Sequence, residues 1–174
     1  MRKFILLLFL ILYPSNLLAE NKIVYLDVQF VIDNSDLGVS YKEKIKEAQK
    51  KNRIDLSIKE KVIKEKELEI TNQKNILKKD EIDKKVVKLN ELLNEYQKLK
   101  NNLNKKIIEN KKKYSVKILN ILNPLLTNYV EKNNIILVVE KKNILIGIKS
   151  LDITSEILNM INEETKKNNL LNEN

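Results

Sequence analysis

Residues 82–97 read IDKKVVKLNELLNEYQ and belong to a long stretch, 38–132, that has no glycine after its first residue and a single proline, Pro124. Glycine and proline normally interrupt helices, so their scarcity predicts very long helix. The second half carries an apolar stripe at Ile82, Val86, Leu89, Leu93, Tyr96, Leu103, Ile107, Tyr114, Ile118, Ile121 and Leu125. Its steps alternate four and three with one extra step of four, and Lys100 and Asn110 occupy two of its positions. This spacing is typical of a coiled-coil seam.

The first half of the stretch predicts a second arm. Its seam positions are Tyr41, Ile45 and Ala48, followed at every seventh residue by Leu56, Ile63, Ile70 and Leu77. A single uninterrupted helix is possible, but Asp80 is a good N-cap, and Glu81 and Asp83 place negative charge in a new first turn. We therefore expect two antiparallel arms that turn near residues 79–81, so that the numbers of facing residues add to about 160. Gly38 then faces Leu122.

The segments on either side of the arms predict a small β body, residues 20–38 and 133–162. Lys22–Leu26 has the composition of a strand, and Asp27 can cap a short helix. Residues 135–139 and 144–148 are two apolar runs that predict a hairpin with a polar loop at 140–143. Thr154 is expected to cap a last helix, with Ile157, Leu158 and Ile161 on one face, before a flexible tail, 163–174. The fold class is therefore α+β, with helical arms on residues 39–132.

The first residues predict export. Arg2 and Lys3 precede an apolar run, Phe4–Tyr13, and residues 14–19 end in Ala19. Ten apolar residues suit the core of a signal peptide and are too few to span a bilayer. We expect residues 1–19 to be a cleaved signal peptide, and the alternative is a retained membrane anchor.

The composition argues against an enzyme. The chain has no cysteine and no histidine, which removes the commonest general base and the soft metal ligands. Its only glycines are Gly38 and Gly147, so it has no glycine-rich phosphate loop. The acidic residues lie among lysines on helical faces, as solvated charges usually do. We expect no catalytic site, no cofactor and no metal.

Positive charge is concentrated on the arms. Residues 39–132 contain 25 Lys and Arg against 14 Asp and Glu, a net charge of +11, whereas residues 20–38 carry a net −3. Eight of these cations form what we call the basic belt: Lys50, Lys51, Arg53, Lys105, Lys106, Lys111, Lys112 and Lys113. An AT-rich genome, whose codons favour lysine, could account for the total charge of the chain. It explains less well why the positive charge is concentrated on the arms. The alternative is an electrostatic funnel for acidic chains or anionic lipids. The arms lack the aromatic residues that stack on nucleic-acid bases.

Four segments together resemble the Skp/OmpH family of periplasmic chaperones. They are KIVYLDVQFVI (22–32), NILNPLL (120–126), NIILVV (134–139) and LDIT (151–154). The order of strand, long helical hairpin, strand pair and helix covers the entire chain after the predicted signal peptide. It implies a homotrimer whose helical arms surround a cavity for unfolded outer-membrane proteins. Anionic lipid or lipopolysaccharide is a further partner expected from the positive charge of the arms.

The expected function is an ATP-independent periplasmic holdase that captures unfolded β-barrel membrane proteins. A body of three short strands has a marginal core and needs partner chains, so an oligomer interface is expected there. We assign it to Ile23, Tyr25, Ile135, Leu137 and Val139, and client capture to the basic belt. A membrane-tethered structural coiled coil of the cell envelope is the alternative. No nucleic-acid partner is expected.

Overall fold

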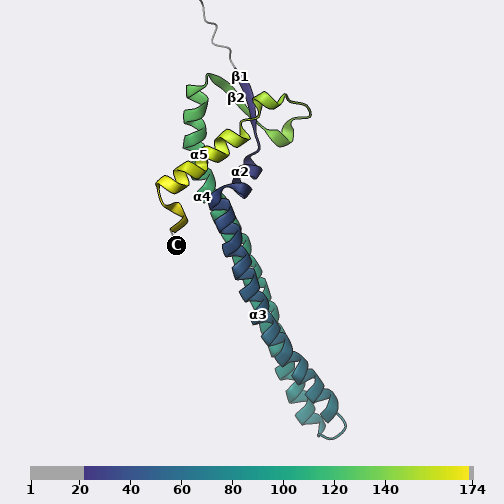
Figure 1. Cartoon of the computed structure of the whole chain (residues 1–174). Coiled ribbons are helices and arrows are strands. Elements are labelled where there is room, and N and C mark those ends of the chain that lie inside the picture. Colours follow the sequence, from purple (N-terminus) through teal and green to yellow (C-terminus); the bar gives the residue numbers. More distant parts are fainter. Residues whose placement is uncertain (1–21, 173–174) are drawn as a thin grey trace, which may run out of the picture.

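The computed structural model describes residues 22–172. The elements are β1 Lys22–Leu26, α2 Val28–Asn34, α3 Asp36–Gln73, α4 Lys79–Lys132, β2 Ile135–Glu140 and α5 Thr154–Lys167, with short 3-10 turns at Lys141–Asn143, Lys149–Leu151 and Leu170–Asn172. The helices α3 and α4 lie side by side and project far from a small body formed by the other elements (Figure 1). The predicted α+β fold, a long helical hairpin on a small β body, is confirmed. The predicted signal peptide, residues 1–19, lies outside the described residues.

The corner between α2 and α3 is held by local caps. Asp27 caps α2, and its carboxylate accepts a hydrogen bond from the backbone N–H of Phe30 at 2.8 Å, as the sequence predicts. Ser35 then ends α2 and caps α3, where its hydroxyl oxygen accepts from the N–H of Gly38 at 3.1 Å. A Cβ atom on Gly38 would overlap the carbonyl oxygen of Ile32, so only glycine allows this close approach.

The turn at the tip of the arms comes slightly earlier than predicted. The helix α3 ends at Gln73, and α4 begins at Lys79 after the linking residues 74–78. Lys78 is the N-cap residue, so the expectation that Asp80 caps α4 was wrong. Asp80 instead lies in the first turn, where its negative charge still favours the helix N-terminus.

The register between the arms differs from the prediction by five to six residues, or about one and a half helical turns. Three contacts join level positions: Tyr41 with Tyr114, Lys59 with Glu95, and Glu69 with Lys85. The residue numbers of these pairs add to 154 or 155 (41 and 114 give 155) rather than to about 160. Gly38 is therefore level with residue 117 and not with Leu122. The shift follows from the earlier turn at the tip.

The shifted register changes which side chains of α4 lie between the arms. The seam on α3 is as predicted, because Tyr41, Ile45 and Ile63 are buried and Leu56 and Ile70 are partly buried. Leu77, the last predicted seam position, lies in the link between the helices. On α4 the less exposed positions are Ile82, Lys85, Leu89, Leu92, Tyr96, Leu99, Leu103 and Ile107. Val86 and Leu93, which the sequence placed in the seam, are instead 39% and 38% exposed.

The sheet of the body is two-stranded and parallel, with Ile23 opposite Leu137 and Tyr25 opposite Val139. The predicted second strand of a hairpin, residues 144–148, was wrong. The chain leaves β2 in a 3-10 turn, and residues 144–148 form no ladder within the described part of the chain. A later segment pairs with β1 instead, since the N–H of Ile153 donates to the carbonyl of Tyr25 at 3.0 Å.

The helix α5 closes the body. Ile157 and Ile161 are fully buried on its predicted face, and Leu158 packs against the same core. Thr154 is the first helical residue rather than the cap, and its hydroxyl oxygen accepts from the N–H of Asp27 at 3.0 Å, which joins α5 to the start of α2. The helix continues to Lys167, so the tail begins later than predicted. The core also takes in Ile118 and Leu122, and the last turns of α4 therefore belong to the body.

Candidate functional site

The basic belt lies entirely on exposed faces of the arms. Lys50, Lys51 and Arg53 come from α3, and the other five members come from α4. Lys105 Nζ lies 3.8 Å from a carboxylate oxygen of Glu109, and both side chains are largely exposed. Within residues 22–172 the remaining members have no ion pair. Their charges are therefore available to an acidic partner, although salt screens exposed charges beyond roughly 8–10 Å.

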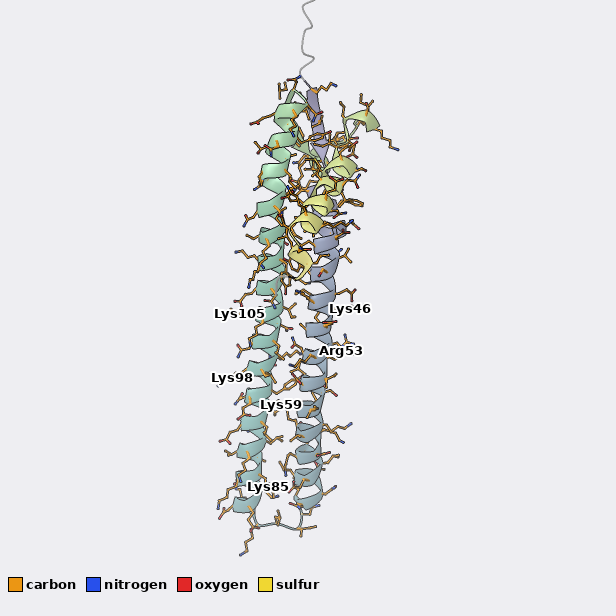
Figure 2. The ribbon with its side chains drawn as sticks, turned by 60° about the vertical axis from the view of Figure 1, so that its left-hand side comes forward. Lys46, Arg53, Lys59, Lys85, Lys98 and Lys105 are labelled. Carbon is orange, nitrogen blue, oxygen red and sulfur yellow. The ribbon has the colours of Figure 1, made fainter. Side chains whose placement is uncertain are left out.

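The belt divides into two groups along the arms. Lys50 is level with Lys105, so these two and their neighbours lie about midway along the hairpin. Residues 111–113 lie six to eight residues closer to the body than Lys105, or roughly 10 Å at 1.5 Å per residue. Figure 2 shows Lys105 and Lys98 on the side of α4 that faces away from α3, whereas Lys59 and Lys85 lie between the arms. The sequence predicted one belt, and the structure separates it into a middle and a root group.

Apolar side chains on the outside of the arms are not among the predicted site residues. Exposed members on the two arms are Val39, Ile54, Ile58, Val62, Leu68, Val86, Val87, Leu93, Ile108 and Val116. Ile58 and Ile108 are 60% and 67% exposed, which is unusual for isoleucine in a long helix with its own packing partner. The members on α3 could be predicted from the seam periodicity, since they lie beside the seam. The exposure of Val86 and Leu93 could be predicted only once the register between the arms was known.

The arms do not close fully in their middle. A groove of about 700 Å³ lies between them and is lined by both polar and apolar residues, among them Arg53, Leu56, Lys100 and Ile107. The hydroxyl of Tyr96 donates across it to the carboxylate of Glu60, and this hydrogen bond raises the pKa of the tyrosine. Polar residues at the seam explain the gap, because they cannot replace the apolar contacts that hold the rest of the hairpin.

Near the tip, an ion triad joins the two arms. The carboxylate of Glu69 accepts from Lys66 of its own helix at 2.7 Å and from Lys85 of α4 at 2.5 Å. These two hydrogen bonds lower the pKa of Glu69 to about 2. Lys85 thus occupies a seam position by pairing with an acid of the opposite arm.

The predicted oligomer interface contains two kinds of residue. Ile23 and Leu137, which lie opposite each other in the sheet, are 50% and 51% exposed. Tyr25 and Ile135 are buried within the chain itself, and Val139 is half-buried. The hydroxyl of Tyr25 donates to the carbonyl of Ile148 at 3.2 Å. Ile23 and Leu137 are therefore the members that remain available to a partner chain.

Four further apolar residues of the body are strongly exposed. Ile136 is 60% exposed, and Leu145, Ile146 and Ile148 of the segment after β2 are 102%, 94% and 66% exposed. The predicted interface did not include Ile136, and the other three were placed in the second strand of a hairpin. Together with Ile23 and Leu137, they form what we call the body patch.

Residues 22–172 contain no cluster of three or more acidic side chains that could hold a metal ion. No helix in the same range is long and apolar enough to cross a bilayer.

Comparison with known proteins identifies the fold. A family model described as outer membrane protein (OmpH-like) matches residues 22–161. No curated protein matches the sequence. A crystal structure of a candidate outer membrane chaperone (OmpH-like) from Caulobacter crescentus CB15 superposes with a TM-score of 0.74 at 11% sequence identity, covering 83% of this chain and 85% of that chain.

Proposed function

The chain belongs to the OmpH-like family of outer membrane proteins, and on that premise we propose that it is a chaperone which holds unfolded outer-membrane β-barrel proteins without ATP. The observation that carries this proposal is the surface of the arms. Exposed apolar residues such as Ile58 and Ile108 lie on the same projecting hairpin as the basic belt. An unfolded membrane protein offers apolar segments and acidic side chains, so such a surface can contact both.

Binding by this surface would be weak at each site and distributed over many. Burying half of an isoleucine side chain gains only about 1 kcal/mol, and an exposed ion pair gains at most about that much. Many such contacts can hold a chain, and each of them breaks easily. A client can therefore be released without an energy source. Lysine side chains provide further weak contacts with a client, because their aliphatic stems cover apolar surface while the ammonium stays in water.

The chaperone would act as a homotrimer with a cavity between the arms. The body patch supports this assembly, since Leu145 and Ile146 project into solvent and the core of a single body is small. Three hairpins around one axis would multiply the number of weak contacts available to one client. The basic belt would then attract acidic clients, and anionic lipids or lipopolysaccharide could compete for it.

The site of action would be the periplasm, after cleavage of residues 1–19. The alternative is a structural coiled coil tethered to the membrane by that segment. The mass of the mature N-terminus, measured on protein purified from the cell envelope, separates the two: a chain beginning near Glu20 supports the chaperone, and a chain that keeps Phe4–Tyr13 supports the tether.

The proposed function is tested by diluting a urea-unfolded β-barrel membrane protein into buffer without ATP and following its aggregation by light scattering. The full chain, without residues 1–19, is expected to suppress aggregation. A matched variant replaces residues 47–108, which include Ile58, Ile108 and five members of the basic belt, with a short Gly-Ser linker; the cut positions are level in the hairpin. This variant is expected to lose the ability to suppress client aggregation, while its body remains folded. If both proteins act equally, the arms are not the client-binding surface.

A further inference from the structure

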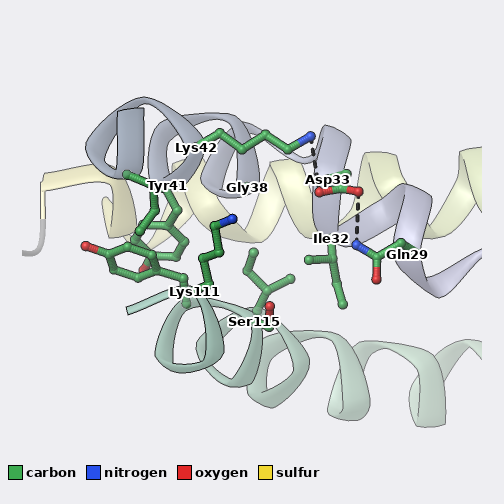
Figure 3. Close-up of a pocket in the computed structure, with 11 residues that line it drawn as sticks. Gln29, Ile32, Asp33, Gly38, Tyr41, Lys42, Lys111 and Ser115 are labelled. Carbon is green, nitrogen blue, oxygen red and sulfur yellow. Dashed lines mark hydrogen bonds and ion pairs between the residues drawn. The ribbon is translucent and has the colours of Figure 1, made fainter. Parts of the chain in front are cut away.

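A pocket of about 350 Å³ lies at the root of the arms, between α2, the start of α3 and α4 (Figure 3). It is open to solvent on one side and lies at the lower end of the size range of small-ligand pockets, roughly 300–1,000 Å³. This volume suits the end of a peptide chain better than a longer segment. Of the basic belt, the pocket includes one member, Lys111.

The floor of the pocket is apolar and fixed. Ile45 and Ile118 are buried beneath it, and the stacked rings of Tyr41 and Tyr114 close one end. The backbone at Gly38 forms the wall toward α2, where a side chain would not fit. A rigid floor of this kind binds an apolar side chain without first having to order its own residues.

The polar rim of the pocket carries one cation, Lys111, that has no anionic partner within residues 22–172. Asp33 accepts from Gln29 Nε2 at 2.9 Å and pairs with Lys42 Nζ at 3.1 Å, and both interactions hold the pKa of the carboxyl below its ordinary value. Lys111 and Ser115, on the opposite side, have no hydrogen-bond or ion-pair partner within residues 22–172. Figure 3 shows the Lys111 ammonium extending from α4 toward α3 across the pocket. The rim can therefore accept one more negative charge.

We propose that this pocket binds the C-terminal residue of an unfolded polypeptide, with an apolar last side chain on the isoleucine floor and the terminal carboxylate at Lys111 and Ser115. This deepens the proposed function, because the client would then be held by its chain end as well as along the arms. Capture of C-terminal carboxylates by fixed donors is a known mode of peptide recognition. The open side lets the rest of the peptide leave with its backbone in water. A fatty acid would need an enclosed apolar tunnel for its tail, which this pocket does not offer.

The test uses fluorescence anisotropy with a short labelled peptide of glycine and serine that ends in phenylalanine. The form with a free carboxylate is expected to bind about fivefold more tightly than the C-terminal amide, the value of one well-placed but partly exposed ion pair. Lys111→Gln should abolish this difference. Lys117→Gln is the matched control, since Lys117 lies six positions farther along α4, is outside the basic belt and does not line the pocket; it should preserve the difference.

Three results would overturn the proposal. They are equal binding of the acid and the amide, equal loss in both lysine variants, and displacement of the peptide by decanoate at lower concentration than by the unlabelled peptide. Ser115→Leu gives a second check, because it fills the pocket and should weaken both peptide forms. Aggregation suppression by the unmodified chain, measured in parallel, separates this proposal from the proposed function. If the unmodified chain suppresses aggregation but binds the acid and the amide peptide equally, the pocket assignment fails and the proposed function stands.

Discussion

The rings of Tyr41 on α3 and Tyr114 on α4 stack with their centroids 4.1 Å apart and their planes 8° from parallel. The pair lies where the arms leave the body, and Tyr41 is only 7% exposed. Two flat rings in contact resist sliding along the helix axes, so this pair holds at the root the register that the turn sets at the tip.

The first prediction tests this anchor. Tyr114→Ala should lower the free energy of unfolding by about 2 kcal/mol, because it removes the stacking and part of the buried area of a half-buried ring. Tyr114→Phe keeps the ring and should change stability by less than about 0.5 kcal/mol. Urea unfolding followed by circular dichroism, at one fixed protein concentration, measures both. Equal values for the two variants would show that the stack contributes nothing.

The second prediction concerns assembly. Leu137→Asp should dissociate the oligomer, since it places an unpaired charge in the proposed interface. Leu137 is 51% exposed in the single chain, so the body itself should remain folded. Val116→Asp, at a 45% exposed position of α4, is the control. Light scattering should give the mass of one chain for the first variant and that of a trimer for the second. A trimer in the Leu137→Asp variant would place the interface elsewhere.

The third prediction concerns the basic belt. Changing Lys50, Lys51, Lys106 and Lys112 together to Gln should slow the capture of an acidic client and reduce its dependence on salt, while release changes little. These four have no ion pair within the described residues. Stopped-flow fluorescence at two salt concentrations measures the rate.

The control for the belt removes the same charge from elsewhere: Lys22, Lys132, Lys149 and Lys167 to Gln, all exposed and without an ion pair within the described residues. Lys141 and Lys142 are unsuitable because they pair with Asp152 and Glu140. If both sets slow capture equally, total charge and not its position on the arms matters.

The fourth prediction separates apolar retention from electrostatic capture. The double change of Ile58 and Ile108 to Ser should leave stability within about 0.5 kcal/mol, because both side chains are exposed, but it should speed client release severalfold. Phe30→Ser, at a 47% exposed position of α2 away from the arms, is the control and should not alter release. Dissociation of a labelled client after dilution is the measurement. Unchanged release in the double variant would mean that these apolar residues do not hold the client.

The fifth prediction concerns pH. The pKa of Glu69 is about 2 against an ordinary value of 4.5, so its tie between the arms is fully present above about pH 4.5 and is lost as the pH falls through about 2. Carboxyl-detected NMR should give a midpoint near 2, and Lys85→Gln should raise it. Lys84→Gln, which removes a neighbouring charge that does not pair with Glu69, should move it much less. A midpoint near 4.5 in the unmodified chain would contradict the triad.

The parts of this fold that depend on local interactions could be predicted from the residues alone. The near-absence of glycine and proline made the arms helical, the carboxylate of Asp27 capped α2, and the Asn133-Asn134 pair ended α4, where Asn134 adopts a positive φ of 53°. The apolar face of α5 and the strand at Lys22–Leu26 could also be predicted. The ordered segments were sufficient for the family resemblance, which the family model confirms.

The way these elements pack against one another depends on contacts between distant residues. A seam with a seven-residue repeat permits neighbouring registers of similar quality, so the register is set by the position of the turn and by the Tyr41–Tyr114 stack. In this register Lys85 lies in the seam, and Val86 and Leu93 are exposed. Residues 144–148 have the composition of a strand, but a strand exists only where a neighbour supplies its hydrogen bonds. Within the single chain, β1 bonds to β2 and to residues 152–153 instead.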